Sequence, residues 1–291
     1  MSNPAHEARL ADDTAMGAVE LLVRDLDTMT SYYHDAVGLD VLGAHATTVS
    51  LGNRAGEQVV VLRQEKGLPP AGRRSAGLYH TAILFPDHAS LAGSLQSVAR
   101  RAPGTFTGSA DHLFSEAFYF TDPEGNGLEL YRDRPRDQWT YDSDGNLQSA
   151  TLYLDPNEFL RTHLRSSGAE ARAADSTVGH VHLQVGDIPT ARAFYVDTLG
   201  FDVTIDVGSA LFVSAGGYHH HIAMNTWASR GAGPRAASLG LGQVNIDVPT
   251  RDEVAKLAER VRLAGLRHTD DGRTLTVADP WNTQVRVSAA A

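Results

Sequence analysis

Histidine and carboxylate side chains carry the chemistry that this sequence offers. The chain of 291 residues contains 13 His and 35 Asp or Glu but no Cys, which excludes a thiol nucleophile, a zinc–thiolate site and an iron–sulfur cluster. Any metal must therefore be held by His, Asp or Glu. Such side chains occur in four apolar segments, LYHTAILF (78–85), GLELY (127–131), GHVHLQV (179–185) and GGYHHHIAMN (216–225). Two imidazoles and one carboxylate could hold a divalent metal and leave coordination positions open.

The apolar character of these segments predicts β-strands. Residues i and i+2 of a strand share one face, so His180 and His182 are alternative metal ligands. Each of these His could also be a packed side chain, and Glu129 could be a partly exposed strand residue. In 216–225, alternation predicts that His220 faces away from His219 and His221. A surface His cluster or an adventitious metal patch is the alternative there.

The elements that position these residues repeat along the chain. Residues 17–41 align without gaps with residues 179–203. Each copy predicts a strand, a polar turn at an Asp and an amphipathic helix that ends at a Gly suited to a left-handed C-cap. Residues 78–132 and 240–287 are more divergent copies of the same pattern. A repeat of this kind predicts an architecture built from similar modules.

Two further signals support the divergent copies. Helices are predicted over about 88–101 and 251–264. DPEGNGLEL (122–130) and DPWNTQVRV (279–287) each turn sharply into a final strand. The fold class is therefore α+β, with four modules of strand–helix–strand–strand–strand; a generic α+β protein with chance turn chemistry is the alternative. Such a module leaves one sheet face bare, so modules must combine in pairs.

The domain organisation follows from the repeat. It predicts a polar N-terminal tail (1–16), the first two modules (17–132), a linker with a short helix near 156–165 (133–178) and the last two modules (179–291).

Charge and hydropathy exclude several classes of partner. The formal net charge is −10, from 25 basic and 35 acidic residues, which argues against sequence-independent binding to nucleic acid or an anionic membrane. No apolar run approaches the roughly 20 residues of a membrane span. The segment MSNPAHEARLADDTAMG is polar and of mixed charge, so no signal peptide is predicted and a cytoplasmic protein is expected.

The four modules and the DPxGNxxE turn resemble the vicinal oxygen chelate superfamily over about residues 17–287. This superfamily includes glyoxalase I, fosfomycin and bleomycin resistance proteins, and extradiol dioxygenases. The resemblance implies two curved-sheet pseudo-barrels and a divalent metal held by ligands on the first and last strands of a module. First-strand positions hold Ala18, His80, His180 and Gln243, and last-strand positions hold Glu129 and Arg286. The complete set, His80, Glu129 and His180, falls in modules two and three and forms a facial triad.

Further residues resemble those of extradiol dioxygenases, and the displaced ligand pattern resembles a bacterial subgroup of catechol 2,3-dioxygenases. His220-His221-Ile222-Ala223 matches an H-x-[VI]-A pattern whose first His acts as base and oxygen-activating acid. In residues 111–130, His112 and Tyr119 match a His and a Tyr that hydrogen-bond the substrate. Their interval is two residues shorter than in the family pattern, and a core aromatic is the alternative for Tyr119.

The resemblance implies an extradiol dioxygenase that opens a catechol-type aromatic diol with O2. Its cofactor would be Fe(II), with Mn(II) as the alternative, and its assembly a homo-oligomer. His182 would form part of the pocket wall. A rival enzyme is a glyoxalase-like isomerase using Ni(II), Zn(II) or Mn(II), but its fourth ligand, a Glu on the last strand of module three, is replaced by Ala223 or the His cluster. A non-enzymatic binding protein of the bleomycin-resistance kind would usually lack the triad.

Overall fold

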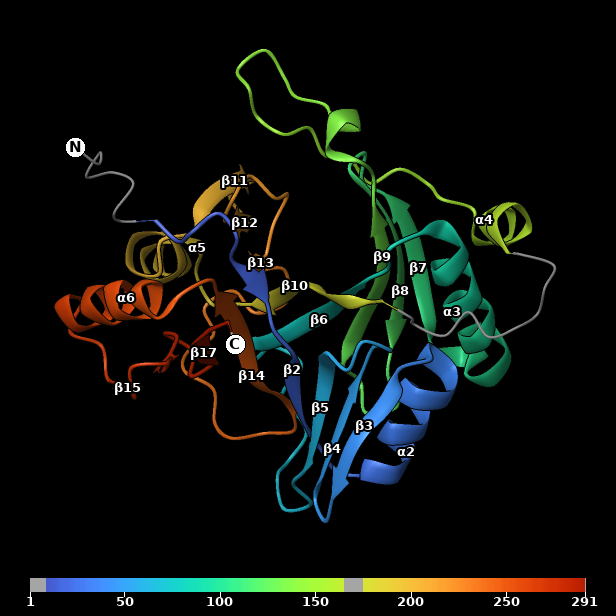
Figure 1. Cartoon of the computed structure of the whole chain (residues 1–291), viewed down its shortest axis with the longest axis horizontal. Helices are drawn as coiled ribbons and strands as arrows, with labels where there is room; N and C mark the ends of the chain where they lie inside the picture. The colour runs from blue at the N-terminus through green and yellow to red at the C-terminus, as the bar shows by residue number, and fades with distance from the viewer. Residues whose placement is uncertain (1–8, 165–174, 291) are drawn as a thin grey trace. The chain divides into compact units, whose positions relative to one another are not determined.

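The computed structural model describes residues 9–164 and 175–290 (Figure 1). Parts of the predicted tail (1–8) and of the predicted linker (165–174) lie outside these residues. The chain divides into two compact units, one of residues 18–68 with 80–179, and one of residues 1–17, 69–79 and 180–291.

The first of these units holds module one, module two from residue 80 onward and the helix that follows, and it ends within β10 at residue 179. Its elements are, in chain order, β2 (Val19–Val23), α2 (Leu26–Ser31), η1 (Tyr32–Val37), β3 (Asp40–His45), β4 (Thr48–Gly52), β5 (Gln58–Gln64), β6 (Gly77–Leu84), α3 (His88–Arg101), η2 (Pro103–Thr105), β7 (Phe106–Asp111), β8 (Ser115–Thr121), β9 (Gly127–Asp133), η3 (Arg136–Gln138) and α4 (Pro156–His163). In Figure 1, α3 lies against the strands of module two, and α4 contacts α3.

The second unit holds modules three and four, with β1 (Ala15–Met16) paired to β14. Its other elements are β10 (Thr177–Gln184), α5 (Ile188–Arg192), η4 (Ala193–Thr198), β11 (Asp202–Asp206), β12 (Ala210–Ser214), β13 (Ile222–Asn225), β14 (Gly240–Val248), α6 (Arg251–Leu263), β15 (His268–Asp270), β16 (Thr274–Ala278) and β17 (Gln284–Ala289). The predicted βαβββ pattern is therefore confirmed in all four modules.

Each module has the same strand order. Its first strand runs parallel to its last, as in β6 with β9 and β10 with β13, and the remaining neighbours are antiparallel. Module two has the order β6-β9-β8-β7, and the other three modules repeat it. The strands belong to two mixed sheets, each built from paired modules, which confirms the predicted fold class. First and last strands are neighbours, so side chains placed on them can converge on one point.

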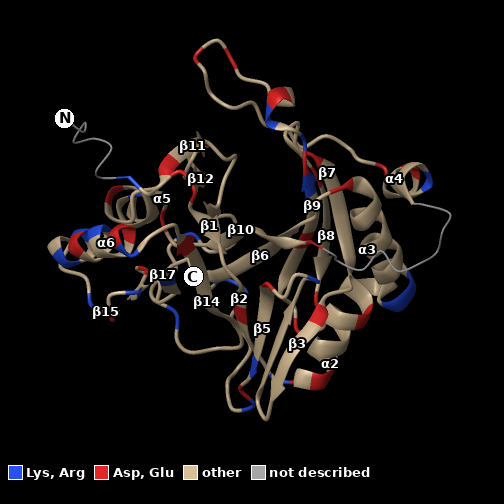
Figure 2. Ribbon diagram, viewed as in Figure 1, with Lys and Arg blue, Asp and Glu red and all other residues tan. Residues whose placement is uncertain are grey.

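The two longest helices begin at capping residues. Asp87 accepts a hydrogen bond from Ser90 N–H at the start of α3, and Thr250 accepts one from Glu253 N–H at the start of α6. The predicted bounds of α3 and α6 agree with the structure to within one residue. Figure 2 shows charges of both signs on α6, which has Asp252 and Glu253 in its first turn and Arg260 and Arg262 in its last turn. Both placements favour the helix dipole.

The helices after β2 and β10 differ from the predicted regular helix. Each continues as a π-helical turn, η1 or η4. Gly38 follows η1 in the left-handed conformation expected of it, with φ of 100°. The π-turns carry Tyr33 and Tyr195, which are fully buried. Side-chain periodicity does not separate a π-turn from an α-turn over so short a stretch.

A buried Tyr–Asp hydrogen bond joins the two modules of each unit. Tyr33 donates to Asp122 Oδ2 at 3.1 Å, and Tyr195 donates to Asp279 Oδ2 at 3.0 Å. Both Asp residues open the repeated turn before the last strand of the next module. Burial raises the pKa of Asp122 and of Asp279, although hydrogen bonds to each carboxyl oppose that rise. The repeated Tyr and Asp of the sequence are therefore partners.

The length and hydropathy of the helices decide whether one of them could cross a membrane. Within residues 9–164 and 175–290, none is both long and apolar enough to cross a membrane.

Candidate metal centre

His80 and Glu129 converge because their strands are parallel neighbours. Glu129 on β9 is the register partner of Ala82 on β6, and His80 lies two residues before Ala82 on the same face. His80 Nε2 lies 3.0 Å from Glu129 Oε2. Both side chains are buried, which is rare for a carboxylate unless a cation or hydrogen-bond donors accompany it.

His180 completes the group. It lies on β10, the first strand of module three, and is buried. One potential ligand atom from each of His80, Glu129 and His180 can be chosen so that all three lie within 4.8 Å of one another. In the part of the chain that the structure describes, no other three His, Asp or Glu side chains form such a group. The ligands thus come from modules two and three, as the sequence predicts.

This donor set fits a divalent transition metal. Two ligand atoms at about 2.1 Å from one cation and at right angles to each other would be about 3 Å apart, which matches the His80–Glu129 distance. Imidazole suits iron, zinc, copper and nickel, and two His with one carboxylate leave one face of an octahedron open. The corresponding positions of modules one and four hold Ala18, Gln243 and Arg286, and none of these belongs to the metal-binding group found among the described residues.

His182 has different surroundings from His180. Its Nε2 lies 2.9 Å from the side-chain amide of Asn225 on β13. Its ring makes edge contacts with Tyr79 and Trp227 at centroid distances of 4.8 Å and 5.4 Å. His182 is therefore enclosed by aromatic rings and contacts an amide, and its place in a pocket wall stays a prediction.

The three consecutive His residues precede β13 rather than starting it. β13 begins at Ile222, so the alternation expected for His219, His220 and His221 does not apply. His219 Nδ1 and His220 Nδ1 are 2.8 Å apart, which places these two rings together rather than on opposite faces. All three His are buried, so the alternative of a surface cluster is wrong. The prediction failed because a turn, not a strand, carries these residues.

His220 lies beside a predicted metal ligand. Its ring centroid is 4.1 Å from that of His180 and 5.1 Å from that of Phe212. His221 differs, because its Nδ1 accepts a hydrogen bond from Ala215 N–H at 3.2 Å and is thereby committed to the backbone. Of the two, His220 is the one whose ring lies against the metal-binding group.

His112 and Tyr119 form a hydrogen-bonded pair next to His80. His112 Nε2 lies 2.7 Å from Tyr119 Oη, and His112 Nδ1 lies 2.7 Å from the carbonyl oxygen of Ala150. A carbonyl can only accept, so Nδ1 carries the proton, and in the neutral ring Nε2 accepts from Tyr119. Tyr119 is the register partner of Glu129, and its ring centroid lies 5.7 Å from that of His80. The shorter interval in the sequence therefore still brings this pair together.

Sequence reasoning missed two groups of the site. One is Asn225 on β13, whose side-chain amide contacts His182. The alternating pattern GHVHLQV around His182 gives no sign of this contact. The Ala150 carbonyl belongs to the segment between β9 and α4, whose path depends on tertiary contacts. An antiparallel bridge of Asp111 with Leu152 brings that segment to His112. A backbone acceptor leaves no residue-type signal, so the sequence could not have revealed it.

Comparison with known proteins finds a matching family and a similar protein. Residues 15–130 and 177–287 match the Glyoxalase/Bleomycin resistance protein/Dioxygenase superfamily. The chain is 37% identical over 276 residues to the catechol-2,3-dioxygenase of Bacillus subtilis (strain 168), a match that covers 92% of this chain and 95% of that protein.

Two solved structures show the same fold at low sequence identity. Glyoxalase I from Zea mays has a TM-score of 0.57 at 16% identity, covering 95% of this chain and 92% of that one. A protein from Bacillus subtilis subsp. subtilis str. 168 has a TM-score of 0.64 at 11% identity, covering 97% and 86% of the two chains.

Proposed function

The chain belongs to the glyoxalase, bleomycin resistance protein and dioxygenase superfamily, and on that basis we propose that it is an extradiol dioxygenase that opens a catechol-type aromatic diol with O2. The observation that carries the proposal is the buried group of His80, Glu129 and His180 in a chain that is 37% identical to a catechol-2,3-dioxygenase over nearly its whole length. The binding-protein alternative does not account for three converging buried ligands.

We propose Fe(II) as the metal, with Mn(II) as the alternative ion. A cation held by His80, Glu129 and His180 would lower the pKa of the diol hydroxyls and offer open positions for two adjacent oxygens. The donor set supports a transition metal, and iron is proposed because O2 chemistry with such a triad is typical of Fe(II).

His220 is assigned the proton transfers. Its Nδ1 and that of His219 are 2.8 Å apart, so one of these atoms donates and the other accepts. When His219 Nδ1 donates to His220 Nδ1, neutral His220 carries its proton on Nε2 and can act as an acid. When His220 Nδ1 donates instead, its Nε2 has no proton and can act as a base. A proton shift within the His pair would thus let one ring remove a substrate proton and later return one.

Tyr119 and His112 are assigned the orientation of the substrate oxygens. With its proton donated to neutral His112, Tyr119 presents oxygen lone pairs that can accept from a substrate hydroxyl. If His112 becomes protonated, its Nε2–H donates to Tyr119 and the phenol can donate in turn. The hydrogen bond between His112 and Tyr119 can therefore reverse its direction when the substrate gains or loses a proton.

Metal analysis and oxygen uptake test this function together. The chain would be purified without air, its metal determined, and oxygen consumption recorded with catechol while the yellow ring-opened product is followed by absorbance. Iron with oxygen uptake is expected. Nickel or zinc without uptake, but with isomerisation of a hemithioacetal, would instead establish the glyoxalase-like reaction. The matched control is Glu129→Gln, which keeps the side-chain shape but should lose both metal and uptake.

We further propose a homo-oligomer and a cytoplasmic location, both supported by the family resemblance. Light scattering of the metal-loaded chain tests the assembly, and fractionation of the source cells tests the location.

A further inference from the structure

His112 sits in a turn whose backbone is unusual for its sequence. Leu113, two residues after β7 ends, has φ of 73°, the left-handed region that bulky side chains avoid. Asp111 Oδ1 accepts a hydrogen bond from Leu113 N–H at 2.9 Å, and His112 N–H donates to Ser115 O at 2.9 Å. A bulky residue keeps such a conformation only when its surroundings hold it there.

The same turn occurs in modules three and four with a glycine in place of leucine. Asp206 Oδ1 accepts from Gly208 N–H at 2.8 Å, and Asp270 Oδ1 accepts from Gly272 N–H at 2.8 Å. The φ values are 73° for Gly208 and 79° for Gly272. Glycine adopts this conformation without steric penalty. Module two thus has the same turn conformation as modules three and four, although Leu113 is a residue that disfavours it.

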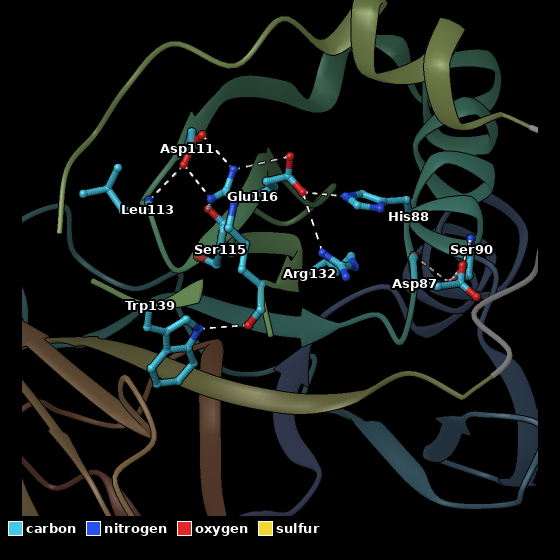
Figure 3. Close-up of polar contacts among 10 residues, drawn as sticks. Asp87, His88, Ser90, Asp111, Leu113, Ser115, Glu116, Arg132 and Trp139 are labelled. Carbon is cyan, nitrogen blue, oxygen red and sulfur yellow. Dashed lines mark hydrogen bonds and ion pairs between the residues drawn. The ribbon is translucent and has the colours of Figure 1, made fainter. Parts of the chain in front are cut away.

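Arg134 forms an ion pair with Asp111 of this turn. Its Nη1 donates to Asp111 Oδ1 at 2.7 Å and its Nη2 to Asp111 Oδ2 at 2.8 Å, a two-pronged ion pair (Figure 3). The backbone of Arg134 is fixed as well, because its N–H donates to Phe114 O and its carbonyl accepts from Trp139 Nε1–H at 2.8 Å. The side chains of Asp111 and Arg134 are only 24% and 23% exposed, which limits screening of the pair by water.

Asp111 also fixes the second partner of His112. Its backbone N–H donates to Leu152 O at 3.0 Å, and its carbonyl accepts from Leu152 N–H at 2.9 Å. Leu152 lies two residues after Ala150, whose carbonyl faces His112 Nδ1. The pKa of Asp111 is consistent with a permanent charge: burial would raise it, but the hydrogen bonds from Arg134 and Leu113 outweigh burial and lower it.

We propose that Arg134 and Asp111 are positioning residues that hold His112 in a single orientation and tautomer for its contact with Tyr119; their catalytic value rests on the function proposed above. The ion pair maintains the left-handed turn at Leu113, and the turn directs the imidazole toward Tyr119. Module three lacks a His at this place, where Val207 stands, and its turn needs only a glycine.

The test follows the ring nitrogens of His112 by NMR. The native chain, labelled with 15N-histidine and loaded with diamagnetic Zn(II), should show His112 as one tautomer with its proton on Nδ1; loss of the signal in His112→Gln assigns it. In Arg134→Ala the 15N chemical shifts of His112 Nδ1 and Nε2 should move toward each other, because the ring would exchange between its two tautomers. The Fe(II)-loaded variant should lose roughly tenfold or more in kcat for catechol, with KM changed less than about threefold, as expected for misplacement of a catalytic side chain.

A rescue separates positioning from general stability. Adding Leu113→Gly to Arg134→Ala should restore the single tautomer and part of kcat, because glycine adopts the turn without the ion pair. Arg134→Lys, which keeps the charge but not the fork, should be intermediate and replaces Arg134→Ala if that variant does not fold. Arg192→Ala is the control: it breaks the Arg192–Asp206 pair of 2.6 Å beside the glycine turn of module three and should change neither readout.

Unchanged nitrogen shifts and kcat in a folded Arg134 variant would overturn the proposal. If the native chain did not cleave catechol, the proposed function would fail, while the NMR comparison would still decide whether the ion pair positions His112.

Discussion

At the level of single residues, two His of module three are alternative ligands of the metal. His180 and His182 share one strand face, but His180 lies within 4.8 Å of the other ligand atoms and His182 is engaged with Asn225. His180→Ala should therefore lose most of its bound metal and its activity, whereas His182→Ala should keep most of the metal. Metal content per chain after anaerobic purification measures both. Metal loss confined to His182→Ala would reverse the ligand assignment.

Both of these variants should remain folded, because the ligands lie on strands whose hydrogen bonds do not involve the metal. Far-UV circular dichroism of the two variants provides that control. A metal-free variant that unfolds would behave like a zinc finger, in which binding supplies the folding free energy.

His220 offers a second test at this scale. His220→Ala should retain iron, because it is no ligand, and should lower turnover of catechol by roughly 10² to 10⁴, the usual contribution of a positioned proton-transfer group. The loss should be smaller for 4-nitrocatechol, whose hydroxyls ionise more readily. Steady-state oxygen uptake with both substrates gives the comparison, with His268→Ala of module four as control. Undiminished catechol cleavage would remove His220 from the mechanism.

At the scale of elements, the Tyr–Asp hydrogen bonds should contribute to stability. Tyr33→Phe removes the donor to buried Asp122 and should lower the free energy of unfolding by about 1–3 kcal/mol at neutral pH. The Tyr33 bond lowers the Asp122 pKa, which burial raises above 3.8, so the bond stabilises the ionised carboxyl. Its contribution is present above the folded pKa and is lost as the pH falls through it.

Urea unfolding of Tyr33→Phe at neutral pH and at pH 4 measures this difference. Tyr32→Phe is a matched control, since the Tyr32 hydroxyl has only a 3.5 Å contact with Thr105 Oγ1 and should contribute less. Equal losses for the two variants, or a loss at Tyr33 that grows on acidification, would contradict the assigned role of the bond.

Helices and strands with strong local signals were predictable from the sequence. The amphipathic pattern and Asp87 cap define α3, and the repeat defines all four modules, because each depends on local periodicity and capping. The start of β13 escaped prediction, since Gly216-Gly217 marks a turn but nothing local shows at which later residue of GGYHHHIAMN the strand begins. The place of Ala150 depends on the Asp111–Leu152 bridge, a contact between distant residues.

At the scale of the whole molecule, four copies of one module have come to differ in what their corresponding positions hold. First-strand positions carry His80 and His180 in modules two and three but Ala18 and Gln243 in modules one and four. Because last and first strands are neighbours in every module, the fold supplies the same geometry four times and residue type decides where a metal can bind. The ligand set was predictable because the superfamily resemblance marks these strand positions, whereas the metal's identity depends on chemistry beyond the fold.

Isotope labelling shows whether this site inserts O2 into an aromatic diol. The Fe(II)-loaded chain would be mixed with catechol under 18O2, quenched quickly, and its product analysed by mass spectrometry. Addition of O2 across the opened ring bond predicts a ring-opened product that carries both labelled atoms, with the carboxylate label surviving even if the aldehyde exchanges with water. Intact catechol, or a ring-opened product without 18O in its carboxylate, would contradict the account.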